Sequence, residues 1–466
     1  MTSRTKCVPA ALVAAFLILT GPLAAAFRLP RPEKISLANG MTFYYLRTTD
    51  VPLVSFQLYI GGAGSAAEPA ELEGGANLAA DLLLKGTATM TADEVAEALE
   101  FMGADLFTSA AEEYVRVSLE SLAEHFPRAL EIAADCLMSP AFKDEEFRKE
   151  RDRRIDQLKA IKDEPGQAVR YYFQKAYFGD HPLGRLSSGT EASLGRMSAQ
   201  ALKAFYEARY RPARTVGAVV GDIEKRALVA LLERTLGKWR NPAGPTPAAS
   251  LPPPPRPRGP RLVLVDKPDA TQAYFVLGAP GYPMGDPITA AAQLMNTLFG
   301  GRFTSWLNTE LRIERGLTYG ASSAFRSWRS GGLFTATSYT KNDKIGEMLD
   351  ITFGLLRKGS AQGFEAAEVE SARNYIEGQF PPTLEANGSK AGTYVRLAFY
   401  GLGFDYYDTY LAKVAGLSPE EAKAAAAKLL PSSDFVLVVV GKSSEIRSLL
   451  QKFGTWQEKK VTDPGF

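Results

Sequence analysis

The chain has 466 residues, of which 45% are hydrophobic and 23% charged, a composition typical of a globular protein with two or more domains. Lys and Arg together number 54 and Asp and Glu 52, and the first 26 residues carry two of the basic side chains and no acidic one. Without those residues the charges balance, which gives no electrostatic basis for binding nucleic acid or anionic lipid.

The first 26 residues have the pattern of a cleavable secretory signal. Arg4 and Lys6 form a positive start, Val8–Leu23 is the apolar stretch, and three alanines precede Phe27. A membrane anchor is the competing interpretation, but two prolines and a glycine interrupt the apolar run. We therefore expect an exported, periplasmic protein without a stable membrane anchor.

Cysteine and histidine are scarce in this chain. Cys7 lies inside the predicted signal, so Cys136 would be the only thiol after export and could form no internal disulfide. The two histidines, His125 and His181, have no ligand-spaced partner and offer no base for thiol catalysis.

The first half begins with strands and continues with strands and helices. Asn39-Gly40 is a hairpin signal, and Thr91 is placed to cap a helix. This grouping predicts an α+β fold of two halves, each an antiparallel sheet with helices packed on one face. The predicted strands are Lys34–Leu37, Met41–Arg47, Val54–Ile60, Asp105–Ala111 and Tyr114–Leu119, and the predicted helices are Leu72–Leu84, Ala92–Met102, Phe126–Leu137, Asp144–Ile161 and Gly166–Tyr177.

One of these helices includes the stretch Gly74–Thr87, which reads GGANLAADLLLKGT and ends in a Lys-Gly-Thr turn. Asn77, Ala80 and Asp81 stand at i, i+3 and i+4, so they share one face of the helix. Taken alone, the pattern is that of an ordinary amphipathic helix.

A proline-rich linker over residues 242–260 separates a predicted N-terminal domain, residues 27–241, from a C-terminal domain, residues 261–466. The two domains repeat a pattern at an offset of 220 residues. Ser198 and Ser418 each open an apolar-periodic helix, and a β-rich run ends at Gly221 in one domain and Gly441 in the other. A duplicated domain explains this repeat.

The second domain contains a further stretch of interest, residues 300–325. Gly300 and Gly301 are predicted to form a loop, either a substrate loop or a turn. A helix over Ser305–Glu314 and a strand over Leu317–Arg326 follow, separated by a stop at Gly316.

Arg312 lies in the last turn of that predicted helix and Tyr319 just beyond the stop, so a helix-turn-strand can bring both to the same side. Structural alternatives exist for each. An Arg near a helix end can interact with terminal carbonyls, and a strand Tyr can fill the edge of a core.

From about residue 29 to 453 the chain resembles the pitrilysin/insulysin family of inverted zinc metallopeptidases. That family carries His-x-x-Glu-His on a helix that runs into Phe-Lys-Gly-Thr, where the histidines bind zinc and the Glu activates water. The Arg312 and Tyr319 spacing also resembles an Arg/Tyr pair of the family's second domain. Further similar segments are Phe147-Arg148-Lys149-Glu150-Arg151, His181-Pro182-Leu183-Gly184, Ser188-Gly189-Thr190, Tyr210-Arg211-Pro212 and Val220-Gly221-Asp222.

The resemblance implies two homologous domains that close over a peptide. It also implies that the metal positions are changed here: Asn77 and Asp81 stand for the histidines, Ala80 for the catalytic Glu, and Gln157 for a third ligand. We expect no zinc in this chain. A self-sufficient enzyme with another metal at Asp81 lacks a visible second ligand.

In two-chain members of that family, one subunit holds zinc and its partner holds the Arg/Tyr pair. The resemblance therefore implies a zinc-less subunit of an exported heterodimeric metallopeptidase, with Arg312 and Tyr319 acting on peptide and zinc held by a partner of the same family. The alternative is a pseudopeptidase that serves as a scaffold or a peptide-binding chaperone.

Overall fold

The computed structural model describes residues 28–241 and 251–463. The expected signal, residues 1–26, and the first nine residues of the expected 242–260 linker lie outside these ranges. Residues 251–260 form no helix or strand and lead into the second of two six-stranded sheets.

The first sheet has the strand order β1-β2-β6-β3-β5-β4. A tight turn joins its first two strands as predicted: Gly40 has a φ of +96°, and the N–H of Leu37 donates to the carbonyl of Met41 at 2.9 Å. All pairs are antiparallel except β2 with β6. The strands are β1 Glu33–Ser36, β2 Thr42–Arg47, β3 Leu53–Gly61, β4 Asp105–Ala110, β5 Tyr114–Leu122 and β6 Thr215–Gly221.

The second sheet has the order β12-β7-β11-β8-β10-β9, and its last five strands in that order repeat this topology. Its edge strand β12 differs from β1, because it follows β11 in the chain and pairs in parallel with β7, as β11 does. The predicted repeat is visible in its caps, because the Ser198 hydroxyl caps α7 and the Ser418 hydroxyl caps α15. The strands are β7 Arg261–Asp266, β8 Gln272–Pro280, β9 Ser322–Trp328, β10 Gly331–Lys341, β11 Val436–Gly441 and β12 Trp456–Lys460.

Helices surround both sheets. The first half contributes α1 Gly75–Leu82, α2 Ala92–Phe101, α3 Phe126–Met138, α4 Asp144–Asp163, α5 Pro165–Phe178, α6 Glu191–Arg196, α7 Ala199–Arg209 and α8 Lys225–Arg234. The second half contributes α9 Thr289–Asn296, α10 Trp306–Asn308, α11 Ile345–Gln362, α12 Ala366–Gln379, α13 Asn387–Tyr400, α14 Tyr406–Gly416, α15 Pro419–Leu429 and α16 Ser443–Leu450.

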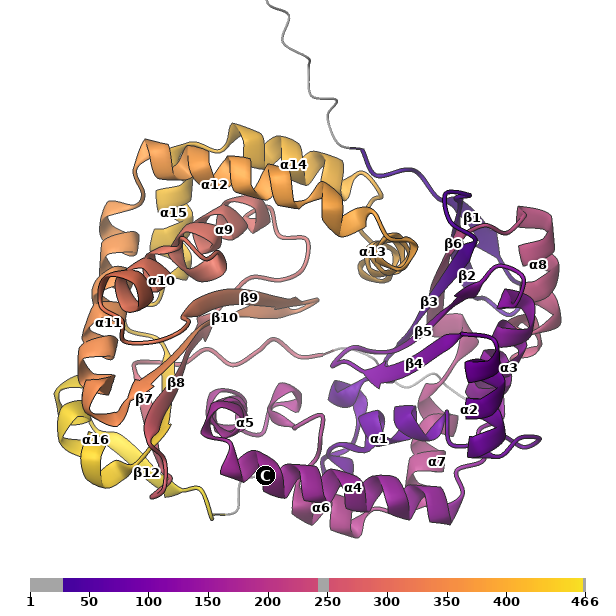
Figure 1. The fold of residues 1–466 in the computed structure, drawn as a ribbon, viewed down its shortest axis with the longest axis horizontal. Helices are drawn as coiled ribbons and strands as arrows, with labels where there is room; N and C mark the ends of the chain where they lie inside the picture. Colours follow the sequence, from indigo (N-terminus) through magenta and orange to yellow (C-terminus); the bar gives the residue numbers. More distant parts are fainter. Residues whose placement is uncertain (1–27, 242–250, 464–466) are drawn as a thin grey trace, which may run out of the picture.

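The two halves exchange helices. Figure 1 shows α13 of the second half beside β3 and β6, and α5 of the first half beside β8 and β11. Tyr394 and Val395 of α13 are fully buried against Ala218 and Val220 of β6. The α+β fold with two similar halves is thus confirmed. Two details differ from expectation. The sheets are mixed rather than wholly antiparallel, and each sheet has a helix of the opposite half packed on part of the face that was expected to be uncovered.

The tips of two hairpins join the halves a second time. Glu112 and Glu113, between β4 and β5, meet Arg326 and Arg329 at the β9–β10 hairpin, with N–O distances of 2.5 and 4.0 Å. Tyr400 of α13 also donates to Glu113 at 2.9 Å. Within residues 28–241 and 251–463, no helix is both long and apolar enough to cross a membrane.

Candidate functional site

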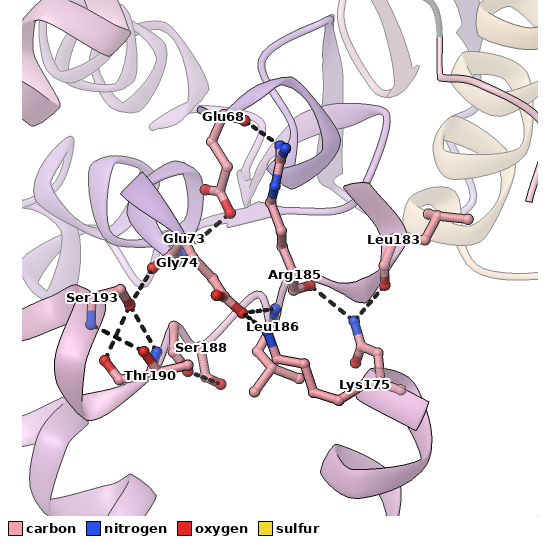
Figure 2. Close-up of polar contacts among 12 residues, drawn as sticks. Glu68, Glu73, Gly74, Lys175, Leu183, Arg185, Leu186, Ser188, Thr190 and Ser193 are labelled. Atoms are coloured by element: carbon pink, nitrogen blue, oxygen red, sulfur yellow. Dashed lines mark hydrogen bonds and ion pairs between the residues drawn. The ribbon is translucent and has the colours of Figure 1, made fainter. Parts of the chain in front are cut away.

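Helix α1 begins at a constrained turn. Gly74 has a φ of +90°, and a Cβ there would lie 2.4 Å from the Cα of Gly189, so only glycine fits. The Glu68 carboxylate accepts the N–H groups of Gly74 and Ala76 at 3.0 and 2.8 Å (Figure 2). These bonds satisfy amides at the helix start, and they explain why α1 begins at Gly75 rather than at the predicted Leu72.

Glu73 fixes the same turn to the rest of the first half. Its carboxylate accepts from the Lys175 ammonium at 2.6 Å and from the N–H of Leu186 at 2.7 Å, as Figure 2 shows. Burial raises the pKa of the neighbouring Glu68 to about 8, against the lowering effect of its two N–H donors. Two glutamate side chains therefore hold the turn before α1: Glu73, which is paired with Lys175, and Glu68, which is buried.

Asp81, at the end of α1, forms an ion pair with Arg154 of α4 at 2.5 Å. The Arg154 side chain is only 8% exposed, and a second guanidinium, that of Arg153, lies 3.7 Å from the same carboxylate oxygen. The Arg154 guanidinium thus binds Asp81, the only one of Asn77, Ala80 and Asp81 whose side chain could serve as a metal ligand.

The side chains at the other three expected metal positions are not placed to bind a metal ion either. Asn77 accepts the N–H of Ala110 of β4 at 3.2 Å, and Ala80 is fully buried. Gln157 is exposed on α4. In the described part of the chain, no group of three or more His, Cys, Asp or Glu side chains is arranged to hold a metal ion. The residues present do not fit a zinc site.

Arg154 was not singled out from the sequence, although a signal was present. Phe147, Glu150, Arg154 and Leu158 recur every three or four residues and form the buried stripe of α4. A charged residue on such a stripe indicates a buried ion pair.

The scarce thiol and imidazoles have structural roles. Burial raises the pKa of Cys136 on α3 to about 12, so it is a protonated thiol at neutral pH. The Nδ1 of His181 accepts the N–H of Leu183 at 3.1 Å, and its Nε2 lies 3.2 Å from the Pro252 carbonyl.

Arg312 lies in a π-helical turn, η7 Thr309–Glu314, that continues α10. Its guanidinium carbon sits 4.7 Å above the ring of Phe303, which is itself half exposed. Among the described residues, its side chain has no hydrogen bond or ion pair. The cation is therefore positioned by an aromatic face and keeps its donors free, and Phe303 is a contributor that sequence reasoning missed.

Tyr319 is not in a strand, in contrast to the prediction. Gly316, with a φ of +60°, ends the helix, and β9 begins only at Ser322. Side chains hold the connection between them, because Asn308 accepts the N–H of Ala321 and Thr318 accepts that of Gly320. As a result the Tyr319 side chain is 79% exposed, and no hydrogen bond joins it to another described residue.

Gly300 and Gly301 end a helical turn, η6 Thr297–Gly301, rather than an open loop. A Cβ on Gly300 would lie 2.5 Å from the Ser323 hydroxyl, and one on Gly301 would lie 2.8 Å from the Asn296 amide. Close packing explains both glycines, against β9 for Gly300 and against the end of α9 for Gly301. Arg312 in η7 and Tyr319 in the connection that follows it both lie in the second half, while α1 lies in the first half.

Known families match two adjoining parts of the chain. Residues 44–191 match the model described as Insulinase (Peptidase family M16), and residues 196–376 match the one described as Peptidase M16 inactive domain. The chain is 29% identical over 427 residues to a Mycobacterium tuberculosis protein named "Uncharacterized zinc protease", covering 90% of this chain and 95% of that protein. A Bacillus subtilis protein with the corresponding name is 24% identical over 361 residues, covering 77% and 86%.

Solved structures share the fold. A crystal structure titled as a peptidase M16 inactive domain from Pseudomonas fluorescens superimposes with a TM-score of 0.82 at 24% identity, covering 88% of this chain and 98% of that one. A structure titled as a protease from Helicobacter pylori gives 0.83 at 19% identity, covering 89% and 100%. The chain belongs to peptidase family M16, the insulinase family, and carries its inactive-type domain.

Proposed function

We propose that this protein is the zinc-less subunit of an exported heterodimeric metallopeptidase. One contrast carries the proposal. In the first half, the Arg154 guanidinium is paired with Asp81 of α1, whereas in the second half Tyr319 has an exposed phenol without a partner in the described chain. The residues of the first half do not fit a metal, whereas the second half keeps free donors.

The two donors suit peptide-bond chemistry. The Tyr319 O–H can donate to the carbonyl oxygen that becomes negative as a peptide bond is attacked. Arg312 offers five N–H donors that stay charged at any working pH and can hold neighbouring peptide carbonyls. The Phe303 ring limits where this guanidinium can lie, which reduces the entropy lost on binding.

The partner in this proposal is a second chain of the same family with intact metal ligands, and it supplies the zinc. The name zinc protease of the Mycobacterium and Bacillus relatives supports peptides as the substrate class. The periplasm is the proposed location, on the strength of the N-terminal sequence pattern alone.

The test is peptide cleavage by the purified complex of this chain with a zinc-bearing family member encoded beside it. Tyr319→Phe should lower kcat by roughly 10²–10³-fold, as the loss of one oxyanion donor does. Arg312→Ala should chiefly raise KM. Tyr375→Phe is the matched control, because Tyr375 is another exposed tyrosine of the second half, and it should change neither constant.

Two results would overturn the proposal. Zinc-dependent cleavage by this chain alone would show that it is not a dependent subunit. Full activity of a complex that carries both Tyr319→Phe and Arg312→Ala would instead favour the pseudopeptidase scaffold.

A further inference from the structure

A cavity of about 610 Å³ lies between α13 and the inner face of the first sheet. Helix α13 covers β3 and β6 (Figure 1), and the cavity beside it is lined by residues of β5 and by Asp105 of the edge strand β4. Helix α1 packs on the other face of this sheet, where Thr108 of β4 donates to the Ala80 carbonyl. The cavity is thus separate from the degenerate metal helix, and from Arg312 and Tyr319.

The floor of the cavity is polar, which is unusual for a face covered by a helix. Alternate residues of β5 line it, namely Arg116, Ser118 and Glu120, while Val115, Val117 and Leu119 point into the core. The pairing register sets Tyr59 opposite Arg116 and Gln57 opposite Ser118. This polar strip has therefore been left out of the hydrophobic core.

Opposite charges stand at the two ends of the strip. Glu120 lies directly opposite Asp105 on β4, and two carboxylates in that position repel each other. At the other end are Arg116 of β5 and Arg396 of α13. None of these four side chains forms an ion pair within the described residues, so each end has a charge to offer to a ligand.

Existing hydrogen bonds hold these groups in place. Ser55 donates to Glu120 at 2.5 Å, Arg116 donates through Nε to Gln57 at 2.9 Å, and Arg396 donates to the Tyr407 hydroxyl. Because Arg116 uses only its Nε in this bond, its two terminal nitrogens stay available.

Two polar side chains between the charged ends each have a free hydrogen-bonding group. Gln57 and Thr393 are 5% and 7% exposed and both line the cavity. Neither the Gln57 amide nitrogen nor the Thr393 hydroxyl has a hydrogen-bond partner in the described chain. Both groups face the open cavity, where they are free to bond to a ligand with amide-like groups of its own.

We propose that this groove binds a short free peptide through both of its termini. The ammonium lies between Asp105 and Glu120, the carboxylate lies between Arg116 and Arg396, and Gln57 and Thr393 bond to the peptide backbone. Glu120 and Arg116 are four residues apart on β5, a distance of about 13 Å along a strand. An extended peptide of three to four residues spans about that length.

The wall of the groove leaves room for a peptide beside α13. Gly388, Ser389 and Gly392 of α13 face the cavity, so a peptide can approach the helix closely. A Cβ on Gly392 would meet no atom within 4 Å, which shows that the space before it is open. The expected ligand is therefore a free tri- or tetrapeptide, for which tetraalanine is a simple probe.

Isothermal titration calorimetry with tetraalanine tests the proposal. The free peptide should bind, and N-acetylation or C-amidation should each weaken binding by about tenfold or more, as expected for a lost charged hydrogen bond. In Arg116→Gln/Arg396→Gln, amidation should have no further effect while acetylation still does. In Asp105→Asn/Glu120→Gln, the pattern should reverse.

Gly392→Leu blocks the groove without loss of fold, because leucine has a higher helix propensity than glycine. It should abolish tetraalanine binding and leave the thermal unfolding midpoint equal or higher. Gly378→Leu is the matched control, an exposed helix glycine of α12 outside the cavity, and should bind normally. No binding to the wild type, equal binding of capped peptides, or binding that survives Gly392→Leu would each overturn the proposal.

Discussion

Arg154 places a positive charge beside Asp81, next to the position where a metallopeptidase would hold its ion. The sequence placed Asn77, Ala80 and Asp81 on one helix face from their spacing, because that periodicity is local. It did not predict which residue of α4 meets them, because α4 lies some 70 positions further along the chain. Single-sequence patterns carry no information about such contacts.

Removal of the guanidinium should cost stability. Arg154→Met leaves the largely buried Asp81 carboxylate with only the exposed Arg153 nearby, and we expect a loss of about 1–2 kcal/mol in the free energy of unfolding. Urea denaturation measures it. The control is Lys159→Met, which breaks the exposed pair with Asp156 and should change stability by less than about 0.5 kcal/mol. Equal losses in the two variants would contradict a special role for Arg154.

At the scale of elements, strong local patterns were predicted well. The Asn39-Gly40 turn and the Thr91 cap are both present, the latter as a full capping box with Glu94. The start of β9 was not predicted, because side-chain hydrogen bonds rather than strand pairing hold the chain up to Ala321. Tyr319 is exposed because it lies in this connection, before β9 begins at Ser322.

The start of α1 should depend on pH. The folded-state pKa of Glu68 is raised to about 8, so folding favours its protonated form, and the stability this confers is lost as pH rises from about 4.5 to 8. One proton sets the largest slope at about 1.4 kcal/mol per pH unit. Urea unfolding of the wild type and Glu68→Gln from pH 5 to 8 should give curves that diverge with this sign. Parallel curves would contradict it.

At the scale of the whole molecule, the exchange of α13 and α5 was not visible in the sequence. Nothing in the sequence of α13 indicates that this helix packs on the opposite half's sheet. The polar groove beside it follows from the same arrangement, because α13 covers only part of that sheet. Repeat and linker signals suggested self-contained halves, whereas each half completes the other's core.

A fragment of residues 28–241 should therefore fail to fold alone. Without α13, the face of β6 that carries Ala218 and Val220 is bare, together with Tyr59 of β3. Near-UV circular dichroism should show no fixed aromatic environment for this fragment, while the full chain unfolds in one cooperative transition. Mixing it with a fragment of residues 251–466 should restore the signal. A native-like spectrum from the first fragment by itself would contradict the prediction.

The exchange of α5 and α13 also suggests a reason why the first half is retained although it lacks metal ligands. Deletion of the first half would remove α5 and expose the apolar face of β8 and β11. These strands belong to the sheet next to the connection that carries Tyr319. Single substitutions remove the metal ligands of the first half one by one, but α5 of that half is still needed to cover the second sheet. We therefore expect selection on the second half to preserve the backbone of the first half as well.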